Sequence, residues 1–470
     1  MAIDLVIKNG KVVTPERVLE ADVAVDKGKV VALGEGKIFP EAKKTIDAKD
    51  KLVFPGGIDS HTHFETKFMG AVPEETWEKG TKAAALGGTT TVINFSIQQT
   101  GKPLMDSVKA DIARAGSLAV TDFALHGCFI DFSNVDAVLD EIPVLVKAGV
   151  PSIKEFLIYR DVGWMVDDWA LYNILEKSMK YLGFVGIHAE NAYIGEGLRQ
   201  RLTKEGKIEP KYHPISKPNL VEAEAIQRSC AIAEATKAYM YIVHMSTHEG
   251  VRLVKGFREK GMPIFSETCP HYLYYTDALH GDPKMGVYSQ LSPPLRKEED
   301  IDALWAGLAS GAVSIVGSDH APFNKASKEK GYELKGFITV PNGAPGVLER
   351  FPVVYSEGVG KNRISLTRFV EITSTNSAKM FGLYPRKGTI APGSDADIVV
   401  FDPKKKVKLG AHLYEGMDWS IFEGVDITGF PETTLLRGKV IVENGKVVGK
   451  AGEGRFVEGK MDEEAIRSIT

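Results

Sequence analysis

The stretch GIDSHTHFE, residues 57–65, ends a short apolar run with His61 and His63, two histidines separated by one residue. Four later stretches also place a reactive side chain where an apolar run ends: PSIKEFLIY (151–159), VGIHAEN (185–191), YIVHMST (241–247) and VGSDHAPF (316–323), with Lys154, His188, His244 and Asp319. A (β/α)8 barrel collects its catalytic groups at the C-terminal ends of its strands. The pattern therefore predicts an α/β fold of the TIM-barrel type with a metal-dependent hydrolytic site at the barrel mouth.

Eight apolar strand candidates alternate with helix-period segments through the middle of the chain. The candidates are residues 53–58, 89–95, 122–130, 152–159, 183–188, 240–244, 263–267 and 312–317. Continuous apolar strands between amphipathic helices indicate a parallel sheet that is covered on both faces. Eight such units match a barrel.

Both chain ends have a different texture, with tight-turn signals between β-rich runs. IKNGKVV (7–13) and VDKGKVVAL (25–33) are matched near the other end by LLRGKVIVENGKVVG (435–449). About 50 residues bury little core alone, so we expect the two ends to pair into one small β-sandwich. The predicted domains are residues 1–54 (first sandwich part), 55–385 (barrel) and 386–470 (second sandwich part and tail).

The composition narrows the partners and the compartment. A formal charge of −4, with 26% charged and 43% hydrophobic residues, gives no reason to expect nucleic acid or an anionic membrane as partner. The three cysteines Cys128, Cys230 and Cys269 lack CxxC spacing, which argues against a disulfide scaffold and against a cysteine-ligated zinc. The N-terminus lacks a basic and apolar leader, so we expect a cytoplasmic protein.

The strand-end side chains form a candidate site for two divalent metal ions. On a strand, His61 and His63 face the same side and can reach one metal. A buried Lys154 would have a lowered pKa, and its neutral amine could add CO2 to become a carbamate that bridges two metals. Taken alone, Lys154 would more readily be a lysine whose ammonium reaches the surface, and only the other strand-end residues favour the carbamate. His188 and His244 are candidates for the second metal, and Asp319 for ligation and proton transfer.

Other polar side chains are weaker candidates. We expect His126, at the end of the third strand, to support the ligands from behind, and Glu267, at the end of the seventh, to be a structural or supporting carboxylate. His213, His248 and His271 lie in or beside loops, where a position on the polar surface is expected. His320 is expected to point away from the metals.

Taken together, the motifs resemble the cyclic amidohydrolases, most closely their hydantoinase/dihydropyrimidinase branch, essentially from end to end. The stretches that carry the resemblance are PGGIDSHTHFE, GGTTTVINF, SIKEFLIYR, HAEN, HPISKPNLVEAEA, ETCPHYL, SPPLR, GSDHAPF, PNGAPGVLER and KGTIAPGSDADIVVFDP, in this order. The resemblance implies reversible hydrolytic ring opening of cyclic amides, such as 5-substituted hydantoins and dihydropyrimidines, by a metal-bridging hydroxide. It also implies a homotetramer, with about residues 440–470 helping assembly.

The resemblance also implies roles for individual residues. Two ions, usually Zn2+, would be held by His61, His63, carboxylated Lys154 and Asp319, and by Lys154, His188 and His244. Tyr159 would stabilise the oxyanion, although a core aromatic is its alternative. Ser292 and Asn342 would bind the cyclic amide edge, largely through backbone groups, although Asn342 also suits a plain turn. We expect an apolar pocket for the ring substituent, formed by Phe64, Phe68, Met69, Phe156 and Trp164.

Several alternatives remain open at this point. Glu65 stands where a carboxylate-binding arginine would favour a dihydroorotase, so that activity is disfavoured. Allantoinase stays possible because allantoin is itself a hydantoin. A non-catalytic interaction protein would have lost the ligands, and an unrelated metal-dependent hydrolase could share the fold. Glu155, beside the candidate bridging lysine, departs from the apolar residue often found there in relatives.

Overall fold

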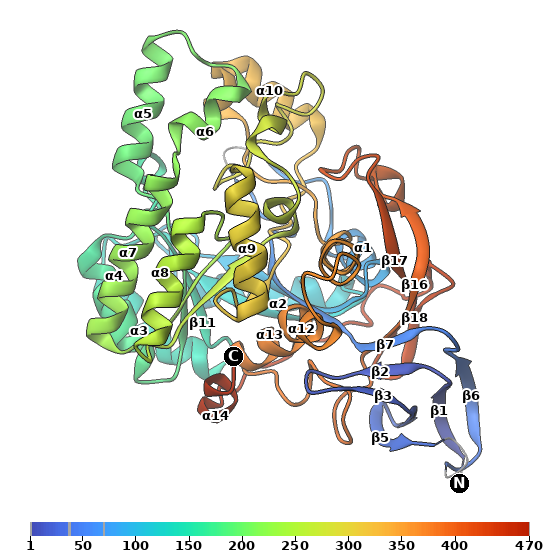
Figure 1. Ribbon diagram of the computed structural model, residues 1–470. Coiled ribbons are helices and arrows are strands. Elements are labelled where there is room, and N and C mark those ends of the chain that lie inside the picture. Colours follow the sequence, from blue (N-terminus) through green and yellow to red (C-terminus); the bar gives the residue numbers. More distant parts are fainter. Residues whose placement is uncertain (1, 36–38, 69–70, 470) are drawn as a thin grey trace.

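The centre of the molecule is a closed parallel sheet with helices around it (Figure 1). The computed structural model describes residues 2–35, 39–68 and 71–469. Eight strands follow one another in chain order: β8 Gly57–Thr62, β9 Thr89–Ile97, β10 Asp122–Cys128, β11 Ser152–Phe156, β12 Phe184–His188, β13 Tyr239–Ile242, β14 Ile264–Thr268 and β15 Ile315–Val316. The first and last meet where His320 N–H donates to the His61 carbonyl at 3.3 Å and His63 N–H donates to the His320 carbonyl at 2.9 Å. The predicted (β/α)8 barrel is confirmed.

Helices cover the outside of this barrel. The helices of this part of the chain are α1 Trp77–Leu86, α2 Leu104–Leu118, α3 Val135–Lys147, α4 Asp168–Met179, α5 Ala192–Lys204, α6 His213–Ser216, α7 Asn219–Thr236, α8 His248–Glu259, α9 Glu298–Ser310, α10 Lys325–Lys335, α11 Arg350–Val354, α12 Leu366–Val370 and α13 Asn376–Met380. Of these, α6 and α10 lie at the mouth end of the barrel (Figure 1). Strand residues that point outward, such as Ile153 and Ile187, pack into this helical layer. No helix in the described ranges is both long and apolar enough to cross a bilayer.

Aromatic side chains fill the lower half of the barrel interior. Phe184 and Phe265 lie with ring centroids 5.5 Å apart, and Tyr241 and Phe381 lie 5.4 Å apart. Above them the inward-facing positions turn polar, beginning with Ser60, His126 and Lys154, which are all buried. The barrel is therefore a packed core whose polar groups collect at the C-terminal mouth.

A second β-structure lies beside the barrel (Figure 1) and uses both chain ends. Its four-stranded sheet has the order β5 Lys29–Gly34, β4 Asp22–Asp26, β1 Ile3–Lys8, β6 Ala42–Asp47. Its seven-stranded sheet has the order β19 Lys446–Val447, β18 Lys439–Glu443, β17 Asp426–Leu436, β16 Ile398–Lys408, β7 Leu52–Pro55, β2 Lys11–Val13, β3 Val18–Glu20. Val53 pairs with Val400 in this sheet, so the predicted sandwich from both termini is confirmed.

A buried charge cluster joins the barrel to the sandwich. The Lys387 ammonium lies 2.6 Å from Asp122 at the start of β10, 3.0 Å from Asp395 and 2.6 Å from Asp397. Arg437 adds a second ion pair to Asp122. These two cations offset part of the cost of burying three carboxylates.

The chain then returns to the floor of the barrel. Phe123 N–H donates to the Arg455 carbonyl at 3.0 Å, and the short helix α14 (Glu463–Arg467) follows. Ile466 and Ile469 pack with the aromatic barrel interior. The tail thereby closes the end of the barrel opposite the mouth.

The first and last barrel strands differ from the prediction. Residues 53–58 form no single strand, because Leu52–Pro55 belongs to the sandwich sheet and the barrel strand starts at Gly57. The predicted boundary at 54/55 thus falls inside β7. The last strand is only Ile315–Val316, shorter than the predicted 312–317. The domain boundaries themselves stay predictions.

Candidate active site

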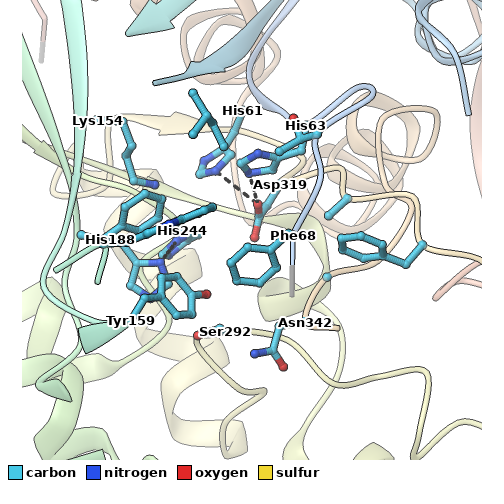
Figure 2. A pocket seen from close by; sticks show the side chains of 17 residues that line it. His61, His63, Phe68, Lys154, Tyr159, His188, His244, Ser292, Asp319 and Asn342 are labelled. Carbon is cyan, nitrogen blue, oxygen red and sulfur yellow. Dashed lines mark hydrogen bonds and ion pairs between the residues drawn. The ribbon is translucent and has the colours of Figure 1, made fainter. Parts of the chain in front are cut away.

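The predicted ligand residues come together at the barrel mouth (Figure 2). His61 Nε2 and His63 Nε2 each lie 3.2 Å from Asp319 Oδ1, and His188 Nδ1 lies 3.0 Å from His244 Nε2. Lys154 comes from the neighbouring strand β11, and its Nζ sits 4.9 Å from the Phe95 ring centroid and 5.0 Å from that of Phe156. Residues from five strand ends therefore face one small space.

Three of the residues at this mouth have a strained backbone. His244 has φ of +36°, Asp319 of +49° and Tyr159 of +64°, all in the left-handed region that favours glycine. The strained residues directly follow or lie just past β13, β15 and β11, where the surrounding barrel fixes the chain. Strain of about 1–3 kcal/mol per residue persists only where packing over-determines it, and it often marks a functional site.

Glu267 orients the first histidine from behind. Its Oε1 lies 2.5 Å from His61 Nδ1, and its Oε2 accepts from the Ser60 hydroxyl at 2.6 Å. His61 Nε2 is buried and has no hydrogen-bond partner among the described residues. A histidine whose far nitrogen is held by a carboxylate presents its other nitrogen as a metal ligand, so this arrangement fits a divalent cation.

Burial favours the uncharged form of several nitrogen donors. It lowers the pKa of His63 to about 4 and that of His188 to about 4, and it lowers the pKa of Lys154 to about 8. Burial acts to raise the pKa of Asp319, but His61 and His63 outweigh it and hold that pKa below its usual range. Neutral imidazoles and an ionised carboxylate are the forms that bind metals, so the donor set fits such ions.

Two connected cavities open from this cluster. The inner one, of about 60 Å³, is lined by the six candidate ligands together with Tyr159, Ser292, Asn342 and the aromatic residues Phe68, Phe156 and Trp164. The outer one, of about 730 Å³, shares Phe68, Tyr159, Trp164 and Asn342 with it. Phe68 lies 5.0 Å from Tyr159 and 5.6 Å from Trp164 between ring centroids, so aromatic side chains form the wall that the two cavities share.

Tyr159 and Asn342 both offer polar atoms to the inner cavity. Burial raises the pKa of Tyr159 and keeps its hydroxyl protonated, and Ser292 lies beside that hydroxyl. Asn342 Oδ1 is buried without a partner among the described residues. A protonated phenol can donate to an oxyanion, and an unpaired amide oxygen can accept from a ring N–H.

Two of the predicted pocket residues require comment. Phe64 does not line either cavity: it is 2% exposed and packs on Trp77 and His320, each with a centroid separation of 5.3 Å. Neighbouring strand residues alternate in direction, so a chain that points His63 inward points Phe64 toward α1. Met69 lies outside the described residues.

The remaining histidines show where sequence reasoning was wrong. His213 and His271 are buried, not on the polar surface: His213 Nε2 lies 2.6 Å from the Leu291 carbonyl oxygen, and His271 packs on Tyr272. His248 is partly exposed, as expected. His126 contacts Ser60 and Ser152, and His320 contacts Glu75, so neither faces the ligand cluster.

Sequence reasoning assigned no role to Glu190 or Lys217. Glu190 is buried against His188, and its carboxylate accepts hydrogen bonds from Lys217 and Ser292. Burial acts to raise the pKa of Glu190, but Lys217 and His188 hold it well below its usual range. The signal available was the position of Glu190 two residues beyond His188, which keeps both on one side if the strand continues.

Comparison with known proteins gives the same family throughout. The model of the amidohydrolase family matches residues 52–441. The chain is 42% identical to the D-hydantoinase of Ralstonia pickettii, covering 97% of this chain and 98% of that protein. It is 38% identical to the D-hydantoinase of Geobacillus stearothermophilus, covering 96% of each chain.

Solved structures agree. The crystal structure of dihydropyrimidinase from Brevibacillus agri superimposes with a TM-score of 0.94 at 38% identity, covering 97% of this chain and 99% of that one. L-hydantoinase from Arthrobacter aurescens superimposes with a TM-score of 0.89 at 31% identity, covering 97% of this chain and all of that one. The chain therefore belongs to the amidohydrolase family, in its hydantoinase and dihydropyrimidinase branch.

Proposed function

We propose that this protein reversibly hydrolyses the ring amide bond of 5-substituted hydantoins and dihydropyrimidines. The observation that carries the proposal is the convergence of three kinds of group on one inner cavity. Neutral histidines and Asp319 form a cation site, Tyr159 supplies a donor, and Ser292 and Asn342 face the same space. Family membership supports the same reaction class.

The ligand set is proposed as predicted. His61, His63, Lys154 and Asp319 would hold one ion, and Lys154, His188 and His244 the other, with Lys154 carboxylated by CO2. Zn2+ suits histidine and carboxylate donors. When bound, two such ions polarise the amide carbonyl and supply a nucleophilic water at neutral pH.

The chain's own residues then do the positioning and proton transfer. Asp319 is placed to take a proton during attack and to deliver it to the leaving ring nitrogen. The Tyr159 hydroxyl donates to the developing oxyanion, which is typically worth about 10²–10³ in rate for one such donor. Ser292 and Asn342 hold the cyclic amide edge, and the aromatic walls exclude water from it.

The inner cavity favours some ring substituents over others. Phe68, Phe156 and Trp164 present apolar faces that suit aromatic or bulky aliphatic groups at the 5-position. No arginine is among the described residues that line the inner cavity, and the one lysine there, Lys154, is proposed to be carboxylated. A free substrate carboxylate would find no arginine there, which disfavours dihydroorotate.

Assembly and location are proposed on narrower grounds. We propose a homotetramer from the family resemblance, testable by light scattering on the eluted peak of a sizing column. The three cysteines are buried and unpaired, as in a reducing compartment, so we propose the cytoplasm.

The direct test is ring opening on a defined panel. We expect turnover of both hands of 5-phenylhydantoin and of dihydrouracil, and little with dihydroorotate or allantoin. Activity should disappear after chelation and return with Zn2+ plus bicarbonate, and less completely with Zn2+ in CO2-free buffer. A metal-loaded protein that opens none of these rings would contradict the proposed substrate class.

A further inference from the structure

One of the motifs behind the resemblance, HPISKPNLVEAEA (213–225), supplies neither a candidate metal ligand nor a substrate contact. It forms α6 and the start of α7, and it lies against the loop that carries Ser292. His213 Nε2 lies 2.6 Å from the Leu291 carbonyl oxygen, directly before Ser292. Further along the same loop, Arg296 donates to the Lys217 carbonyl oxygen. The segment therefore holds one wall of the inner cavity.

Within this segment, Lys217 reaches a buried carboxylate behind the candidate ligands. Glu190 Oε2 lies 2.8 Å from His188 Nε2 and accepts from Ser292 Oγ at 2.6 Å and from Lys217 Nζ at 3.0 Å. Lys217 Nζ also donates to Ser292 Oγ. The Glu190 side chain is fully buried and that of Lys217 is 13% exposed, so water screens the ion pair weakly.

We propose that Glu190 and Lys217 are positioning residues that couple the second metal position to the substrate-binding edge. The inference rests on the proposed function. Glu190 fixes the far nitrogen of His188, which turns His188 Nδ1 toward His244. The same oxygen and Lys217 fix Ser292, which lies beside the Tyr159 hydroxyl. One ion pair thus sets the relative position of a metal ligand and the groups that hold the ring.

This arrangement assigns separable duties to its two members. Glu190 contacts His188 directly, so its loss acts first on the metal. Lys217 contacts Ser292 and Glu190 but not His188, so its loss acts first on substrate binding. Loss of a residue with a merely structural role would lower stability without affecting metal binding and substrate binding separately.

The first experiment compares Glu190→Gln with Lys217→Gln. In E190Q a neutral amide oxygen replaces the charged carboxylate as the acceptor for His188 and holds that ligand less firmly, so we expect one of two Zn2+ ions to bind about 10–100-fold more weakly. In K217Q we expect full metal content and a KM raised about tenfold, with kcat changed less than about threefold, because a charged hydrogen bond to Ser292 is lost. Metal content is measured after dialysis against a competing chelator, separately from turnover.

Matched variants control for general effects. Lys217→Arg keeps a cation beside Glu190 and should return KM to within about threefold of wild type. Lys211→Gln removes an exposed lysine that pairs with Glu209 just before the same motif, and it should change neither metal content nor KM. Thermal unfolding of each variant reports whether the fold is retained.

Specific results would overturn the inference. It fails if E190Q and K217Q keep wild-type metal affinity and KM, or if K217R is impaired as severely as K217Q. If wild type opens no ring on the panel, the proposed function fails, yet the E190Q metal measurement still decides the coupling to His188. Loss of metal in E190Q with an inactive wild type would support the positioning role and reject only the substrate class.

Discussion

Two buried clusters in this molecule both gather side chains that can bind a cation, but they serve different purposes. At the barrel mouth, His61, His244 and Asp319 place ligand atoms within 4.8 Å of one another, and at the seam with the sandwich Asp122, Asp395 and Asp397 do the same. The seam cluster contains its own cation, the Lys387 ammonium. The mouth has Lys154, which donates no hydrogen bond among the described residues.

The difference distinguishes a candidate functional site from a charge cluster that stabilises the fold. At the seam, burial acts to raise the pKa of Asp395, but Lys387 and Lys29 outweigh it and hold that pKa low. At the mouth, His61 Nε2 lies 3.2 Å from Asp319 Oδ1 and makes no hydrogen bond among the described residues, so both atoms are available to a cation. Satisfied charges stabilise the fold, whereas open donors lower stability and enable chemistry.

The comparison is tested most severely by Lys154→Met. We expect kcat/KM to fall by about 10³-fold, because the proposed bridging carboxylate is lost. The free energy of unfolding should stay level or rise, since methionine fits a buried site without an ammonium to desolvate. Steady-state kinetics and urea unfolding measure the two quantities. A variant that keeps its activity would remove Lys154 from the site.

Lys387→Met should give the reverse pattern. Removing one partner of a buried ion pair costs about 3–5 kcal/mol of unfolding free energy, while activity per folded molecule stays near wild type. The penalty should narrow as the pH falls from 8 toward 4, because burial raises the pKa of a carboxyl that has lost its cation and the group then takes up a proton within this range. Urea midpoints from pH 4 to pH 8 follow this. Equal stability of variant and wild type would contradict the seam's bracing role.

Phe64 and Phe68 lie in one loop and offer the same contrast, because Phe64 packs in the core and Phe68 lines the inner cavity. Phe64→Ala should destabilise by about 3–5 kcal/mol, because an ideal Cβ on Gly80 would lie only 2.2 Å from the Phe64 ring and so little space exists to relax into. Phe68→Ala should leave stability nearly unchanged and lower the preference for 5-phenylhydantoin over dihydrouracil several-fold. Thermal melts and paired kcat/KM values separate the two. Interchanged effects would mean that Phe64 reaches the substrate.

The smallest expected effect concerns Glu155, which lies next to Lys154 on β11 but is buried with both oxygens unpartnered among the described residues. Burial raises its pKa well above the usual range. A carboxyl whose pKa is raised in the folded protein lowers the free energy of unfolding as the pH rises above its pKa in the unfolded chain. Glu155→Gln removes this effect, so it should stabilise the protein by about 1–3 kcal/mol at pH 8 and by less at pH 5. Unfolding at both pH values checks this. A constant difference would indicate an unshifted group.

Local signals explain why much of the site was predictable. Strand period and the barrel rule placed His61, Lys154, His188 and Asp319 at one mouth without any knowledge of long-range contacts. The same alternation, applied one residue further, would have turned Phe64 away from the pocket. That error came from treating the loop as irregular.

Other features had no local signal. The apolar run LVFPGGI crosses from one sheet to another, and hydropathy does not reveal the break between Pro55 and Gly57. The contact of Lys217 with Glu190 and Ser292 joins three distant segments, so only the folded chain could reveal it. His213 and His271 look like loop residues because burial by other loops leaves no period in the sequence.

The pairing of β7 with β16 also has a consequence for synthesis of the chain. Val53 meets Val400 across the sheet, so the amino-terminal strands leave the ribosome without their partners. At about 5–20 residues per second, roughly 20 to 70 seconds pass before β16 emerges, during which β-prone edges stay exposed to other nascent chains. Protection by chaperones during that interval, more than the final free energy of unfolding, would then set the yield of active protein.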